Sequence, residues 1–170
     1  LDKTAEDRCI VFLECATSEA LKNAGLDFGQ CDSMRIGVAV ASSLGCVEQL
    51  EAFVRNRDAT FLDHVPHYYP GYHIAEKYNL HGPCVSIDTA CASGSNIFGY
   101  AYDLVSSGRC DVVITGGVDI ISTLSFSGFN SLMNISKETC HPFSHEHLGI
   151  ILGEGCGIAV VESEKHAKKR

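Results

Sequence analysis

The chain alternates between stretches in which apolar residues recur every three or four positions and short runs that are apolar almost throughout. Helical spacing first appears over residues 5–24, where Gly25 follows the last turn, and it returns over residues 47–55. Between these stretches, residues 35–41 form a short apolar run bounded by turn residues. This order predicts a helix, a buried strand and a second helix.

The middle of the chain repeats the same theme around a second apolar run. Residues 56–71 read as a loop, and residues 72–78 are predicted to form a short helix. The strand-like run at residues 84–87 is followed by helical spacing over residues 92–107, which Gly108 ends. We therefore predict a strand that turns directly into a helix.

The last third of the chain adds two further strands. Residues 111–117 are continuously apolar, which is typical of a strand buried on both faces of a parallel sheet. Residues 122–134 are predicted as loop and short helix, and residues 155–162 as a final strand before the start of another helix. The whole pattern predicts an α/β fold with a mostly parallel sheet and helices packed on it.

Length and composition fit one domain with one core. The 170 residues are 45% hydrophobic, and no apolar run approaches the roughly 20 residues that span a bilayer. The first four residues, LDKT, show neither a basic region nor an apolar signal core. Nine cysteines, an odd number without CxxC pairs, favour reduced thiols over a disulfide framework or a zinc site. We expect a soluble cytoplasmic protein with no membrane association.

The net charge argues against nucleic-acid binding, and the histidine spacing argues against a metal site. A formal net charge of −8 argues against nucleic-acid binding, because phosphate-binding surfaces normally carry a basic excess. Two groups of histidines could be imagined as metal sites, but neither shows an HExxH pattern, and solvated loop histidines are the preferred interpretation. The groups are His64, His67 and His73, and His141, His145 and His147.

The chemistry centres on the motif DTACASG, residues 88–94, where the second apolar run meets the helix. A strand-to-helix turn of small residues would place Cys91 at the helix N-terminus, where free N–H groups and the helix dipole stabilise a thiolate. This is the arrangement of a nucleophile elbow with sulfur in place of oxygen, and the Cys91 amide could help to form an oxyanion hole. On spacing alone, a buried packing cysteine is the more common outcome.

A longer stretch of sequence around Cys91 favours the nucleophile over the packing cysteine. Residues 81–117, HGPCVSIDTACASGSNIFGYAYDLVSSGRCDVVITGG, resemble the active-site segment of the β-ketoacyl synthases, the condensing enzymes of fatty-acid and polyketide synthesis. The resemblance implies a thiolase-like fold of which this chain is an incomplete N-terminal half, residues 1–170, without the first strand and the C-terminal half. It also implies that Cys91 carries the growing acyl chain as a thioester, and that two catalytic histidines lie outside the chain.

Residues 140–157 extend the resemblance with departures. Family members read close to CRPFD, RDG and GEGAG, whereas this chain reads CHPFS, HLG and GEGCG. The replacements Ser144, His147 and Leu148 predict a rewired loop rather than a lost reaction. Glu154 is retained between two glycines, and we interpret it as a structural residue that binds backbone N–H groups.

The resemblance implies decarboxylative condensation of an acyl-Cys91 thioester with a malonyl-carrier thioester, although residues 1–170 alone are not expected to condense. No cofactor or metal is implied, because an acyl carrier protein presents the substrates on its phosphopantetheine. Phe126 and Phe129 could wall an acyl pocket, but core packing is preferred for both. The expected partners are an acyl carrier protein and a second ketosynthase subunit, as a homodimer. Docking an acidic carrier would need a local basic patch; the candidates are Arg55, Arg57, Arg109 and residues 165–170, the last preferred as a solvated helix face.

Two other functions stay open. A non-catalytic partner of the same fold would control chain length, but such proteins typically lack the nucleophile, so Cys91 favours the enzyme. A thiolase or acyl-CoA transferase is disfavoured by DTACASG and the later Gly116–Gly117 pair.

Three structural expectations follow. Cys91 should lie between a strand ending near Thr89 or Ala90 and a helix starting near Ala92, largely buried but beside a pocket. Residues 84–89 should form a sheet edge that pairs with a second subunit. By resemblance, a missing first strand leaves a vacant position between residues 35–41 and 111–117. If those two runs pair directly, the argument for the missing strand and the argument for the dimer fail together.

Overall fold

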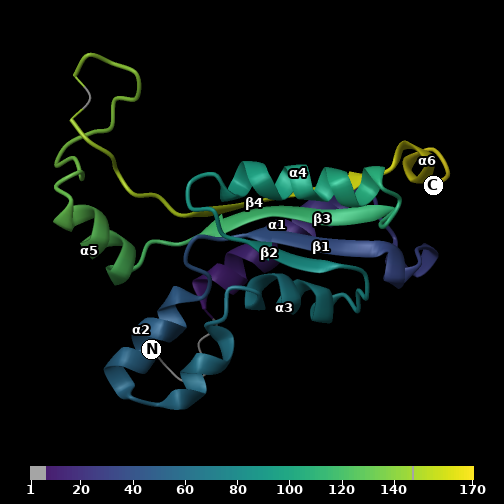
Figure 1. Ribbon diagram of the computed structural model, residues 1–170, viewed down its shortest axis with the longest axis horizontal. Helices are drawn as coiled ribbons and strands as arrows, with labels where there is room; N and C mark the ends of the chain where they lie inside the picture. Colours follow the sequence, from purple (N-terminus) through teal and green to yellow (C-terminus); the bar gives the residue numbers. More distant parts are fainter. Residues whose placement is uncertain (1–6, 147) are drawn as a thin grey trace.

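The computed structural model describes residues 7–146 and 148–170, which form a four-stranded sheet with helices on both faces (Figure 1). The strand order is β2-β1-β3-β4. The strands are β1 (Ile36–Ala41), β2 (Cys84–Ile87), β3 (Val112–Asp119) and β4 (Gly155–Glu162). The first three are parallel and β4 runs antiparallel to β3, so the predicted mostly parallel α/β sheet is confirmed.

The helices lie close to where the apolar spacing predicts them. They are α1 (Arg8–Ala24), α2 (Val47–Asn56), α3 (Tyr69–Lys77), α4 (Ser93–Ser106), α5 (Thr123–Ser131) and α6 (Glu164–Ala167). Residues 5 and 6 of the first predicted helix lie outside the described residues. The predicted loop at 56–71 contains a 3₁₀ helix, Ala59–His64, and the first turn of α3, because Asp58 caps the former and Pro70 suits the N-terminus of the latter.

Alternate residues of the central strands divide the core into two layers. Val38 and Val40 of β1 pack into the cluster that contains residues of α1 and α3, whereas Ala39 and Ala41 pack with Ile97 of α4. Period-two alternation is what a strand between two helical layers requires. All six residues of β1 are buried, which makes it a central strand.

The expected vacancy between residues 35–41 and 111–117 is wrong. β1 and β3 are direct parallel neighbours, in a register that runs from Ile36 opposite Val112 to Ala41 opposite Gly117. The crossover through α4 carries the chain from β2 back past β1, so β3 pairs with the free side of β1 and no strand position is left open. The arguments for a missing strand and for a two-subunit sheet that rested on this vacancy therefore do not stand.

The expectation for β2 itself is confirmed: in the described part of the chain it pairs with β1 alone and lies at one edge of the sheet. At the other end of the fold, α5 extends away from the sheet, and none of its residues is buried (Figure 1). Within residues 7–146 and 148–170, no helix is both long enough and apolar enough to cross a membrane.

Candidate active site

Cys91 lies in the turn that joins β2 to α4. The strand ends at Ile87 and the helix begins at Ser93, so the predicted position of Cys91 between a strand and a helix is confirmed. Because β1, β2 and β3 are parallel and Cys91 follows the end of β2, the thiol is at the carboxyl edge of the sheet. This edge is where open α/β sheets usually bind their ligands.

Hydrogen bonds hold this turn in a strained conformation. Ala90 has a positive φ of 51°, which an L-residue adopts at a cost. The buried Ser93 Oγ accepts a hydrogen bond from Thr89 N at 2.7 Å and donates one to the Ala90 carbonyl at 2.7 Å. Asp88 Oδ1 accepts from Ala90 N at 3.1 Å, and Asn96 Nδ2 donates to Thr89 Oγ1 at 2.7 Å. The two residues that precede Cys91, Thr89 and Ala90, are thus fixed by side chains of the same motif and helix.

The expectation that Cys91 is largely buried is wrong. Its side chain is exposed, whereas that of Ser93, two residues later, is buried. The inward position at the start of α4 is occupied by the Ser93 hydroxyl that braces the turn, so Cys91 faces outward. The helix N-terminus still lies next to the thiol, where its dipole favours negative charge.

Cys91 borders a hollow of about 510 Å³ that is lined mainly by apolar side chains. A volume of this size is within the range of small-molecule sites. Leu124, Phe129 and Leu132 form one wall, and Ile120 and Ile121 belong to another. The thiol therefore lies at the edge of a space that suits an apolar chain.

The two phenylalanines do not fill the core. Phe126 is 50% exposed and Phe129 is 37% exposed, so the preferred core interpretation is wrong for both. They lie on α5, which extends away from the sheet instead of packing on it. Phe129 lines the hollow beside Cys91, while Phe126 is not among its lining residues.

A polar rim, missed by the sequence analysis, faces the same hollow. Asp119, at the end of β3, accepts hydrogen bonds at Oδ1 from Ser43 N at 2.9 Å and from Ser42 Oγ at 3.1 Å. Asp119 and Ser43 both line the space beside Cys91. The available signal was position, because a polar residue directly after a buried parallel strand falls at the carboxyl edge of the sheet.

Glu154 fixes the backbone of Ile121, a residue that lines the hollow. Its Oε2 accepts a hydrogen bond from Ile121 N at 3.0 Å, and its carboxylate also binds Arg8 Nη1 at 2.8 Å. The predicted structural role of Glu154, as an acceptor for backbone N–H groups, is confirmed. Arg8 additionally donates to the Ile121 carbonyl at 2.8 Å, so α1, the end of β3 and the start of β4 are tied together behind the site.

Comparison with known proteins decides the family. The family model for the β-ketoacyl synthase N-terminal domain matches residues 2–167. The chain belongs to the β-ketoacyl synthase family. It is 32% identical over 174 residues to nodulation protein E of Rhizobium leguminosarum bv. trifolii, covering 96% of this chain and 43% of the relative. It is 31% identical over 191 residues to 3-oxoacyl-[acyl-carrier-protein] synthase 2 of Coxiella burnetii, covering 100% of this chain and 45% of the relative.

Solved ketosynthases share the fold. A type II polyketide synthase acyl-carrier protein in complex with its ketosynthase bound to the hexaketide matches with a TM-score of 0.89 and 26% identity, over 98% of this chain and 46% of that one. A β-ketoacyl synthase from Burkholderia phymatum matches with a TM-score of 0.81 and 28% identity, over 95% of this chain and 43% of that one. The fold is therefore that of thiolase-like ketosynthases, and the chain spans less than half the length of these relatives.

The loop that departs from the ketosynthase pattern is largely exposed. Ser144 Oγ donates to the His141 carbonyl at 3.0 Å, a local turn contact, and Leu148 is 67% exposed. His147, the third departure, lies outside the described residues. The rewiring of this loop relative to the family stays a prediction.

Two histidines of the first group, His64 and His73, contact protein side chains. His64 stacks on Tyr69 with ring centroids 4.4 Å apart, and His73 Nε2 lies 2.7 Å from Glu14 Oε1. The hydrogen bonds from His73 and from Lys77 hold the pKa of the Glu14 carboxyl below its usual value. Of the second group, His141 bonds to the neighbouring Thr139 Oγ1 at 2.6 Å, and His147 is again outside the described residues.

Proposed function

We propose that the protein carrying this chain is a β-ketoacyl-[acyl-carrier-protein] synthase and that Cys91 is its nucleophile. The observation that supports this most strongly is the position of Cys91: an exposed thiol on a braced strand-to-helix turn, beside an apolar hollow. The family assignment supports the same role. Phe129, which lines the hollow, is proposed to contact the acyl chain, and Phe126, which does not line it, is not.

The proposed chemistry has two transfers. The Cys91 thiolate attacks the carbonyl carbon of an acyl-carrier thioester, the carrier thiolate leaves, and the acyl group stays on the protein as a new thioester. Loss of carbon dioxide from a malonyl-carrier thioester then produces a carbanion that attacks the acyl carbonyl. The carbon–carbon bond forms as the Cys91 thiolate departs, so the reaction needs no cofactor beyond the phosphopantetheine of the carrier.

Partners are proposed on the same basis. An acyl carrier protein would deliver both substrates, as the complex of the related ketosynthase supports. A second ketosynthase subunit, as a homodimer, would cover the edge of β2, because exposed apolar strand edges are normally paired or covered. This proposal now rests on the edge alone, and a single-chain mass by sedimentation of the full-length protein would contradict it.

Few basic side chains are available to bind an acidic acyl carrier protein. Arg55 is paired with Glu51 at 3.4 Å, and Arg170 Nε bonds to Glu162 Oε2 at 3.0 Å, so both guanidinium groups already have a carboxylate partner. Arg57 and Arg109 are the remaining candidates. We also propose a cytoplasmic location, because all nine cysteines are free thiols, as a reducing compartment would keep them.

Substitution of Cys91 in the full-length protein tests the proposed role. Cys91→Ala is expected to abolish formation of the β-ketoacyl product, and Cys91→Ser to retain little, because a serine hydroxyl lacks the low pKa of a thiol. Cys15→Ala is the matched control, because Cys15 is also an exposed cysteine but lies on α1. This substitution should leave product formation unchanged. Full activity in Cys91→Ala would contradict the nucleophile and favour a non-catalytic subunit of the same fold.

A further inference from the structure

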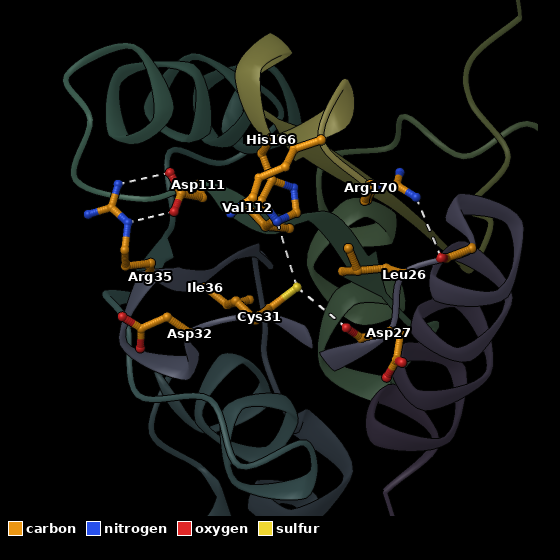
Figure 2. A pocket seen from close by; sticks show the side chains of 12 residues that line it. Leu26, Asp27, Cys31, Asp32, Arg35, Ile36, Asp111, Val112, His166 and Arg170 are labelled. Carbon is orange, nitrogen blue, oxygen red and sulfur yellow. Dashed lines mark hydrogen bonds and ion pairs between the residues drawn. The ribbon is translucent and has the colours of Figure 1, made fainter. Parts of the chain in front are cut away.

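A second hollow, of about 520 Å³, lies at the opposite end of the sheet from Cys91. It is lined by Ile36 and Val112, the first residues of β1 and β3, whereas Cys91 is at the edge where the parallel strands end. The other walls come from the segment after α1 and from the C-terminal segment around α6 (Figure 2). Nothing in the proposed condensing chemistry uses this end of the molecule.

The side chain of Cys31 faces His166 across this hollow (Figure 2). Its Sγ lies 3.7 Å from His166 Nε2, and on the other side of the ring Nδ1 lies 2.7 Å from Glu162 Oε2. Because a carboxylate accepts a hydrogen bond, it favours the tautomer with the proton on Nδ1, which leaves the Nε2 lone pair directed at the sulfur. Thiol, imidazole and carboxylate are thus in the order that activates a nucleophile.

Charged groups hold this arrangement in place. Arg170 Nε donates to Glu162 Oε2 at 3.0 Å, which fixes the carboxylate behind the imidazole. The hydrogen bond from Arg170, and a further one from His166, lower the pKa of the Glu162 carboxyl, so it is ionised at neutral pH. The imidazole of His166 is therefore oriented by a carboxylate that is ionised at neutral pH.

The resting thiol is protonated, because burial together with the nearby Asp27 carboxylate raises the pKa of the Cys31 thiol. Cys31 Sγ has two acceptors, the Asp27 carbonyl at 3.4 Å and His166 Nε2 at 3.7 Å, and rotation of the S–H bond directs the proton to one or the other. Reaction at Cys31 therefore requires a base to remove the proton, and His166 Nε2 is in place to do so. A thiolate of high basicity is also a strong nucleophile once it forms.

The hollow contains charges of both signs. Its cationic lining residues are Arg35, Lys169 and Arg170, and its carboxylates are Asp27, Asp32 and Asp111. Arg35 and Asp111 are paired with each other, and Arg170 is paired with Glu162. A small ligand that carries both ammonium and carboxylate groups can add to such pairs without leaving a charge unbalanced. Zwitterionic peptide disulfides, of which glutathione disulfide is the simplest probe, have this character together with a sulfur that a thiol can attack.

We propose that Cys31 is a modification site, a thiol that His166 activates for exchange with a small zwitterionic disulfide. The Cys31 proton moves to His166 Nε2 as the sulfur attacks one sulfur of the disulfide. The disulfide bond breaks, a new bond forms between Cys31 Sγ and the attacked sulfur, and the departing thiolate takes the proton from His166. One mixed disulfide and one free thiol result, and no other oxidant or reductant is consumed.

The test follows the rate of modification at each cysteine. The full-length protein is incubated with glutathione disulfide, and adducts at Cys31 and at the exposed Cys15 are measured by peptide mapping over time. His166→Asn is expected to slow the reaction at Cys31 by at least about tenfold, because a positioned base contributes roughly 10²–10⁴-fold. The rate at Cys15 should not change. Continued protection of the buried Cys9 and Cys46 reports that the variant is folded.

Two results would overturn the proposal: no adduct at Cys31 in the unsubstituted protein while Cys15 reacts, or an unchanged rate at Cys31 in His166→Asn. If His166→Asn loses protection of Cys9 and Cys46, Glu162→Gln is used in its place. Glu162→Gln should slow the reaction at Cys31 less than His166→Asn, because the glutamine amide still accepts a hydrogen bond from Nδ1–H but has no charge. An unchanged rate at Cys31 in Glu162→Gln would also overturn the proposal. A neutral dialkyl disulfide tests recognition, and equal preference of Cys31 for both disulfides, relative to Cys15, would contradict the zwitterionic ligand. Acyl loading of Cys91 is measured separately, so failure at one site does not mimic failure at the other.

Discussion

At the scale of single residues, the turn before α4 depends on one buried hydroxyl. Ser93 Oγ satisfies Thr89 N and the Ala90 carbonyl together, on either side of a residue with φ of 51°. The motif DTACASG therefore does more than supply small side chains. Its serine, near the end of the motif, forms the hydrogen bonds that hold Thr89 and Ala90, near its start, in place. The exposure of Cys91 follows from this division of roles.

Ser93→Ala is expected to lower the free energy of unfolding by about 1–3 kcal/mol, the cost of leaving a buried polar group without its partner. Acyl transfer to Cys91 should fall as well, since the turn loses its brace. Denaturant unfolding of the full-length protein measures the first effect. Ser95→Ala, an exposed serine on the same helix, is the control; equal stability of the two variants would contradict the bracing role.

At the scale of elements, the contact between β3 and β4 is unusually close at Gly116. A Cβ atom built on Gly116 would lie 2.0 Å from the Gly157 carbonyl oxygen, a distance that no side chain tolerates. A Cβ atom on Gly157, on the partner strand, would meet nothing within 4 Å. Only glycine therefore fits at position 116, whereas position 157 has room for a side chain.

Gly116→Ala is accordingly expected to destabilise the protein by about 1–3 kcal/mol or more through overpacking, because backbone would have to move. Gly157→Ala should change the free energy of unfolding far less. Thermal unfolding of both variants separates the outcomes. If both shift the midpoint equally, the close approach of β3 and β4 is not as described.

The starts of β1 and β3 are joined by an ion pair. Arg35 Nε lies 2.6 Å from Asp111 Oδ2, and the hydrogen bond from Arg35 holds the pKa of the Asp111 carboxyl below its ordinary value of 3.8. A carboxyl whose folded pKa is depressed contributes stability above its unfolded pKa and loses it as pH falls through the folded pKa. Both side chains are more than one-third exposed, so solvent screening keeps the contribution small.

Asp111→Asn should therefore cost about 0.5 kcal/mol of unfolding free energy at pH 7 and nothing at a pH well below 3.8. Denaturant unfolding of the two proteins across this range measures the difference. A gap between them that stays constant from neutral to acidic pH would show that the loss has another origin than the ionised carboxylate.

Apolar spacing was sufficient to predict the elements but not their neighbours. Residues 35–41 are predicted as a strand because they form a short apolar run between turn residues, and residues 111–117 because they are continuously apolar. Hydrophobicity does not say which strand pairs with which. Their direct pairing is set by the crossover through α4, a tertiary feature. The elbow at Cys91 was predictable because strand, small residues and helix are contiguous in sequence. The exposures of Cys91, Phe126 and Phe129 were not, because they depend on which distant segments cover them.

At the scale of the whole molecule, the two ends of the sheet carry different chemistry. The carboxyl ends of the parallel strands hold Cys91, the polar rim at Asp119 and an apolar hollow. The amino ends of β1 and β3 hold Cys31, His166 and a hollow lined by charges of both signs. A parallel sheet makes this separation possible, since each edge collects residues from one end of every strand.

The central claim is that Cys91 receives the acyl group. The most direct measurement incubates the full-length protein with an acyl-carrier thioester, stops the reaction before condensation, and maps the acylated residue by mass spectrometry of its peptides. The account predicts one acyl group, on the peptide that contains Cys91. An acyl group on a different exposed cysteine, such as Cys15 or Cys140, with Cys91 unmodified, would contradict it.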